Sequence, residues 1–121
     1  MELQKLNRAF TVCKIERVET VDFSREFVFL SKTDQEISLV CESAHVPSDP
    51  IAAEAGWQGL KISGVLDFGM IGVLAKIAEI LARAGISIFV VSTYNTDYIF
   101  IKAEKFEKAL GALMENGYTV K

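Results

Sequence analysis

LKISGVLDFGMIGVLA, residues 60–75, is the stretch of sequence that decides the fold. Its alternating start predicts the end of a strand, its glycines predict a turn, and its last residues begin a helix. A second stretch, STYNTDYI, residues 92–99, places small polar residues between two apolar runs and predicts a β-hairpin. A strand, a helix and a hairpin in this order predict a small α+β domain.

The helix in the first of these stretches has an amphipathic pattern. Asp67 is the expected N-cap, and Gly85 supplies the left-handed residue that ends a helix. The apolar side chains recur at helical spacing and predict a face that packs on a sheet. These apolar positions are Met70, Val73, Leu74, Ile77, Ala78 and Leu81.

From residue 57 to the C-terminus the predicted elements follow the order β-α-β-β-α-β. Besides the first helix, these elements are a second helix over residues 104–115 and four strands, at residues 57–65, 86–92, 97–102 and 118–120; the second and third strands form the hairpin. This is the order of the ferredoxin-like α+β fold, in which both helices cover one face of an antiparallel sheet.

The first half of the chain predicts strands and little helix. Strands are expected at residues 9–15, 27–31 and 36–41, and the polar run between the last two predicts an antiparallel hairpin. Two prolines mark a loop, followed by a short helical turn at residues 50–55. The order looks like a degenerate, helix-poor copy of the second half, so we predict two modules, residues 1–56 and residues 57–121.

The composition is that of a folded chain with more apolar residues than its core needs, so that some can form an interface. Of the 121 residues, 50% are hydrophobic and 24% are charged, which predicts a packed core and a homodimer. The net charge is −3 and no cluster of basic residues occurs, which argues against a nucleic-acid partner. No apolar run could span a membrane and no signal peptide is evident, so we expect a cytoplasmic protein without a membrane partner.

Few residues suggest catalysis or metal binding. Cys13 and Cys41 lie in alternating strand patterns, which are typical of buried, reduced thiols. Cys41 and His45 leave a nucleophile-and-base pair as a minor alternative, for a small hydrolase or transferase. No metal-ligand spacing or nucleotide-binding fingerprint occurs. The sequence therefore predicts neither an enzyme nor a bound cofactor or metal.

Two turns contain the candidate ligand-binding groups. Gly69 and Gly72 let the backbone come close to a ligand at the start of a helix, where free N–H groups attract a carboxylate. Asp97 opens a strand after small polar residues, and its carboxylate can meet an ammonium group. Together these groups suit an α-amino acid. The alternative is purely local: Asp67 only caps the helix, Gly72 only permits close packing, and the polar residues only form a turn.

The strings LDF…GVLA and STYNTDYI resemble those of the ACT-domain family, and the resemblance covers residues 57–121 well. The chain looks most like small bacterial proteins made of two ACT-like modules. Related tandem modules form cytosolic arginine sensors in eukaryotes. The resemblance implies a βαββαβ fold, association of modules or dimers, and an amino acid bound at the interface between modules.

The resemblance also implies which residues line the ligand site. The helix-start amides would hold the ligand carboxylate, and Asp97 would hold its amine. The lining residues implied by position are Asp67, Phe68, Gly69, Met70 and Ile71, with Ser92, Thr93 and Asp97 opposite them.

Most regulatory ACT modules are fused to the enzyme that they control, and this chain carries no catalytic domain. We therefore expect a non-enzymatic amino-acid sensor that acts on a separate enzyme or regulator, through an arrangement of subunits that the ligand favours. The competing hypothesis is a ligand-free assembly or adaptor module that works through protein partners.

Overall fold

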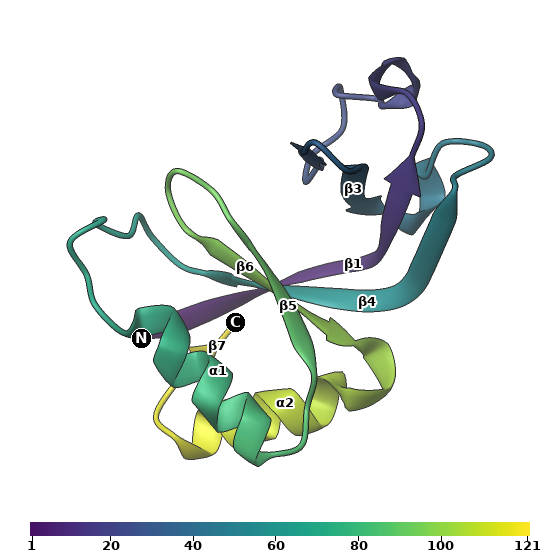
Figure 1. Cartoon of the computed structure of the whole chain (residues 1–121). Helices are drawn as coiled ribbons and strands as arrows, with labels where there is room; N and C mark the ends of the chain where they lie inside the picture. Colours follow the sequence, from purple (N-terminus) through teal and green to yellow (C-terminus); the bar gives the residue numbers. More distant parts are fainter. The chain divides into compact units, whose positions relative to one another are not determined.

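The computed structural model describes all residues, 1–121, and its contacts divide the chain into two compact units. Unit 1 consists of Met1–Asn7 and Gln58–Lys121, and unit 2 is Arg8–Trp57. Two long strands, β1 (Glu2–Ile15) and β4 (Ala52–Ile62), contribute residues to both units. Unit 2 is therefore an insertion in the sequence of unit 1 (Figure 1).

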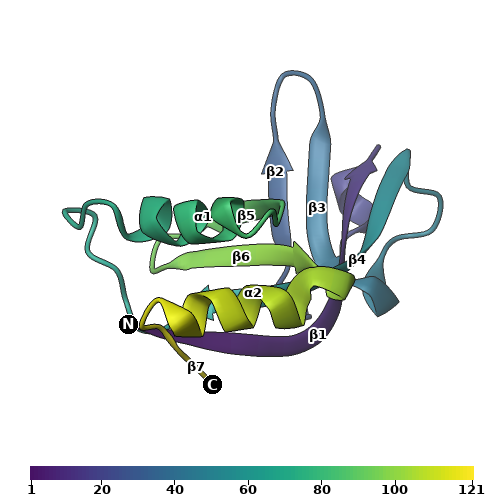
Figure 2. The ribbon, with the colours of Figure 1, turned by 90° about the horizontal axis from the view of Figure 1, so that it is seen from below.

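Unit 1 is an α+β domain in which two helices cover one face of a sheet (Figures 1 and 2). Its strands follow the order β1-β4-β6-β5, and β7 pairs with β1. The remaining elements are α1 (Val73–Arg83), β5 (Ile88–Ser92), β6 (Asp97–Lys102), α2 (Ala103–Glu115) and β7 (Thr119–Val120). The predicted ferredoxin-like fold is confirmed.

The core of unit 1 lies between the helices and the sheet. Ile77 and Leu81 of α1 are fully buried, as predicted from their helical spacing. They pack in one cluster with Leu60, Ile99 and Leu113 from the sheet and from α2. The C-terminal ends of both helices are also as predicted, because left-handed glycines follow them.

The N-terminal residues complete the sheet of unit 1, which the sequence pattern did not predict. Glu2 and Leu3 of β1 pair in parallel with Thr119 and Val120 of β7. Leu3 is 0% exposed and belongs to the core cluster. The predicted strand began only at Ala9, because the apolar residues before it are spaced by three rather than two.

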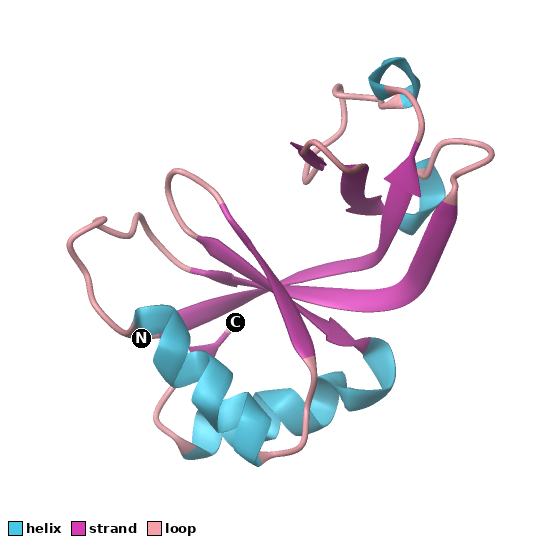
Figure 3. Ribbon diagram, viewed as in Figure 1, coloured by secondary structure: helices cyan, strands magenta, loops and turns pink.

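Unit 2 contains strands and two 3-10 turns, Val18–Thr20 and Ser43–His45, but no α-helix (Figure 3). The predicted hairpin is confirmed, since β2 (Phe29–Lys32) pairs antiparallel with β3 (Ile37–Glu42). β3 also pairs antiparallel with β1. That this unit is a degenerate ACT-like module stays a prediction.

The helical turn predicted at residues 50–55 is wrong. The N–H of Ile51 donates to the carbonyl oxygen of Lys14 at 2.8 Å, and β4 begins at Ala52. Pairing with β1 thus keeps this alanine-rich stretch extended, although its local helix propensity is high.

The predicted start of α1 is also wrong. The helix begins at Val73 after Gly72, whose φ of 78° is left-handed, and Asp67 does not cap it. The Asp67 carboxylate instead accepts the N–H of Gly69 at 2.8 Å, and the Asp67 carbonyl accepts the N–H of Met70 at 2.9 Å. Two local bonds therefore hold this stretch in a turn, and Met70 is exposed rather than in the core.

Both cysteines are buried free thiols in the core of unit 2, as predicted. Burial, with the nearby Cys13 and Glu42, raises the pKa of Cys41 to about 11. The thiol therefore stays protonated near neutral pH, which is the opposite of what a nucleophile paired with His45 requires.

We expect both thiols of the folded protein to react slowly with a disulfide reagent at about pH 8. Burial raises the pKa of both Cys13 and Cys41 above that of an ordinary thiol. The stabilisation from keeping Cys41 protonated is complete below about pH 9 and is lost as the pH rises toward its folded pKa of about 11. Stopped-flow thiol titration with and without guanidinium checks the expectation, and equal rates would contradict it.

Candidate ligand-binding site

A cavity of about 330 Å³ in unit 1 lies at the start of α1. Its walls are the loop over residues 63–72, the first turn of α1 and the turn between β5 and β6. A volume of this size falls within the range of small-molecule sites. The lining residues are Leu66, Asp67, Phe68, Met70, Gly72, Val73, Leu74, Ala75, Ser92, Thr93, Tyr94, Asn95, Thr96 and Asp97. We call this the α1 cavity.

The turn between β5 and β6 is held by its two threonines. The hydroxyl and the N–H of Thr93 both donate to the carbonyl of Thr96, at 2.9 and 2.8 Å. The buried hydroxyl of Thr96 donates to the carbonyl of Ile62 at the end of β4, at 2.8 Å. These bonds fix one wall of the cavity to the central part of the sheet.

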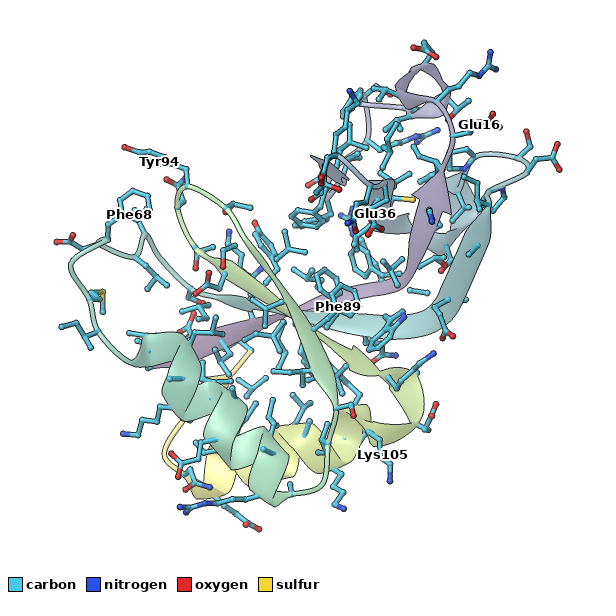
Figure 4. All side chains as sticks on the ribbon, in the orientation of Figure 1. Glu16, Glu36, Phe68, Phe89, Tyr94 and Lys105 are labelled. Carbon is cyan, nitrogen blue, oxygen red and sulfur yellow. The ribbon has the colours of Figure 1, made fainter.

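The loop over residues 63–72 contacts the same turn at two points. The N–H of Leu66 donates to the carbonyl of Asn95 at 2.7 Å. At the tips, the rings of Phe68 and Tyr94 meet edge to face, with centroids 5.2 Å apart (Figure 4). Both rings are mostly exposed, at 77% and 80%.

The first turn of α1 presents backbone N–H groups at this cavity. The N–H of Lys76 makes the first intrahelical bond, to the carbonyl of Gly72, so the amides of Val73, Leu74 and Ala75 have no partner within the helix. Gly72 has no side chain to cap them. Uncapped amides and the positive end of the helix dipole favour an anion at this position.

Two carboxylates line the α1 cavity, and no lysine or arginine does. Asp67 is engaged in its own turn with Gly69. Asp97 stands at the start of β6, paired across the strands with Ser92. It is half-buried, and its carboxylate makes no hydrogen bond or ion pair with the protein. The cavity therefore offers amide donors for an anion and one unpaired carboxylate for a cation.

Six of the eight residues expected at the ligand site line one cavity. Gly69 is absent from the lining, and Ile71 lines a second cavity with Met1, Lys76 and Tyr118. The expected residues that come together are Asp67, Phe68, Met70, Ser92, Thr93 and Asp97.

Sequence reasoning did not assign Tyr94 to the site, and it assigned the helix-start amides to the site but at the wrong residues. The helix was expected to start after Asp67, which placed its first amides several residues too early. Tyr94 lies at the centre of the predicted turn. This position is the one feature of the sequence that indicates a side chain near the loop over residues 63–72.

Two helices on one face of an antiparallel sheet, with an open helix start beside a hairpin turn, define a ferredoxin-like α+β module. The family model described as the ACT domain matches residues 52–115, which is more than half of the chain. The chain therefore belongs to the ACT domain family. Neither of its α-helices is long and apolar enough to cross a membrane.

Solved structures extend the similarity to the whole chain. A protein from Agobacterium tumefaciens is 28% identical with a TM-score of 0.86, over 99% of this chain and 91% of that one. A Vibrio cholerae protein of unknown function, described as a possible transport protein, is 23% identical with a TM-score of 0.74, over 94% and 88%. The ligand-free regulatory subunit of Thermus thermophilus aspartate kinase is 12% identical with a TM-score of 0.63, over 93% and 95%. The sequence has no significant match among curated proteins.

Proposed function

We propose that this chain is a non-enzymatic regulatory protein that binds an amino acid in the α1 cavity. The observation that carries the proposal is the combination of the unpaired carboxylate of Asp97 with the uncapped start of α1 in one cavity. Membership of the ACT domain family supports it, as does the similarity of fold to a regulatory subunit of aspartate kinase.

The cavity offers a complementary partner for each charged group of an α-amino acid. The N–H groups of Val73, Leu74 and Ala75 suit the ligand carboxylate. Asp97 suits the ammonium group, as a charge-assisted hydrogen bond in a partly buried setting. Leu66 and the other apolar lining residues can contact the side chain of the ligand.

We further propose that the protein works as a homodimer in which the ligand lies at an interface between modules. β5 is the outermost strand of its sheet, and its sequence IFVVS contains no charge or proline. Monomeric proteins normally protect an edge strand with such residues. Because β5 leads directly into the turn that lines the α1 cavity, a second copy on this edge would adjoin the ligand. A ligand that prefers one arrangement of subunits could then control a separate enzyme or regulator.

The test is a thermal-shift screen of each proteinogenic amino acid at millimolar concentration, followed by calorimetry. A ligand present at a hundredfold excess over its Kd adds about 2.7 kcal/mol to the free energy of unfolding, which gives a clear rise in Tm. We expect Asp97→Asn to abolish the shift and Asp34→Asn, an exposed carboxylate in the β2–β3 turn, to leave it unchanged.

No rise in Tm with any amino acid would contradict the proposal and favour the assembly or adaptor module. An equal shift in the wild type and in Asp97→Asn would show that the ligand binds elsewhere.

A further inference from the structure

The exposed apolar side chains of this protein gather on one short segment. Nine large hydrophobic side chains are exposed in the chain, and four of them belong to residues 65–71, with Tyr94 directly opposite. Ile71 is 95% exposed. The four are Val65, Phe68, Met70 and Ile71. A surface loop normally consists of polar, turn-forming residues, so this concentration of apolar surface beside a cavity calls for an explanation.

Glycines bound this segment at both ends. Gly64 and Gly72 are both left-handed, with φ of 84° and 78°. A Cβ atom at either position would meet nothing within 4 Å, so both glycines lie in open space. Residues of this kind can absorb the changes in φ and ψ that let a segment move as a body.

Apart from Leu66, which is half-buried and packs against the core, the segment is attached to the rest of unit 1 by few interactions. Between the two glycines, one backbone hydrogen bond reaches another element, from the N–H of Leu66 to the carbonyl of Asn95. The other bonds of the segment, from the N–H groups of Gly69 and Met70 to oxygen atoms of Asp67, are internal and hold it as a compact turn. The contact between Phe68 and Tyr94 joins two exposed rings at the tips (Figure 4). Segments with so few external bonds open at low free-energy cost.

We propose that residues 65–71 form a lid that closes over the α1 cavity when the cavity is occupied. The proposal rests on the proposed function, because the occupant is the amino acid bound there. In the structure, Phe68 and Met70 line the cavity, yet Phe68 is 77% and Met70 48% exposed. When the cavity is occupied, these side chains can pack against the ligand. The apolar area that this contact removes from water would favour the closed state. Closure would also shield the contact between the ligand and Asp97 from water, which strengthens it.

A tryptophan on the lid tests this movement. The chain has one tryptophan, so Phe68→Trp in a Trp57→Phe background carries a single reporter. With the amino acid found in the thermal screen, we expect a blue shift of its emission and weaker quenching by acrylamide. Phe23→Trp in the same background is the matched control, because Phe23 is also an exposed phenylalanine but belongs to unit 2, and it should not respond.

Hydrogen exchange of the unmodified protein provides a second measurement that needs no substitution. We expect the amides of residues 65–71 to exchange more slowly with the amino acid bound, and those of the β2–β3 turn to exchange at an unchanged rate. If the amino acid raises Tm while the reporter and the exchange of residues 65–71 stay unchanged, the lid is refuted and the proposed function stands. If no amino acid raises Tm, both are refuted.

Discussion

Replacing Leu3 by alanine is expected to lower the free energy of unfolding by about 2–5 kcal/mol, the usual cost of emptying a fully buried leucine site. Leu3 is 0% exposed and packs with the core that Ile77 and Leu113 form under the helices. It lies outside residues 52–115, which match the family model, so its large effect follows from the structure alone. Urea denaturation, monitored by circular dichroism, measures this change in the free energy of unfolding.

The matched control for Leu3 is its neighbour Gln4. Gln4 is exposed on the same strand, so Gln4→Ala should change the free energy of unfolding by less than about 0.5 kcal/mol. A similarly small effect for Leu3→Ala would mean that the N-terminal strand is not part of the core of unit 1.

Gly59→Ala is expected to destabilise the protein by about 1–3 kcal/mol, because it adds a methyl group where the core has no room. A Cβ atom at Gly59 would lie 2.7 Å from Cδ1 of Leu6 and 3.2 Å from Cε1 of Phe100. Both side chains are buried, so neither can move into solvent. Thermal and urea denaturation of the variant measure the cost.

A glycine with free space around it provides the control for Gly59. At Gly111, in the middle of α2, an added Cβ meets nothing within 4 Å, so Gly111→Ala should stabilise the helix by up to about 1 kcal/mol. Shortening Leu6 relieves the clash, and we expect the cost of Leu6→Ala combined with Gly59→Ala to be less than the sum of the two single changes. Additive costs would contradict the steric explanation.

Periodicity predicted the elements whose pairing partners are close in sequence. Ile77 and Leu81 identify the buried face of α1, and the turns at 33–36 and 93–96 join strands that pair directly. Two of the errors lie where a distant partner decides the conformation. The strand at residues 2–7 is specified by its partners more than fifty residues away, and Ile51 is kept extended by its bond to Lys14. Local propensity contains no information about such partners.

The candidate site was predictable in part for the same reason. Ser92, Thr93 and Asp97 belong to a turn whose chemistry is local, and they line the cavity as expected. The start of α1 was misplaced because Asp67 has two local uses, as a helix cap or as a turn residue, and the sequence does not distinguish them. Here the turn is formed, and the uncapped helix start is the result.

The insertion of unit 2 into the sequence of unit 1 sets an order of events during synthesis on the ribosome. Every residue of unit 2 has been made once Trp57 has been added, so this unit can fold while the rest of the chain is still being translated. Residues 1–7 of unit 1 must wait much longer, because β7, one of their partners, contains Thr119 and Val120, which are translated long after them. β1 is thus made before most of its partners and is among the last strands of unit 1 to be fully paired, and until then its buried leucines, Leu3 and Leu6, are apolar surface that a chaperone can recognise.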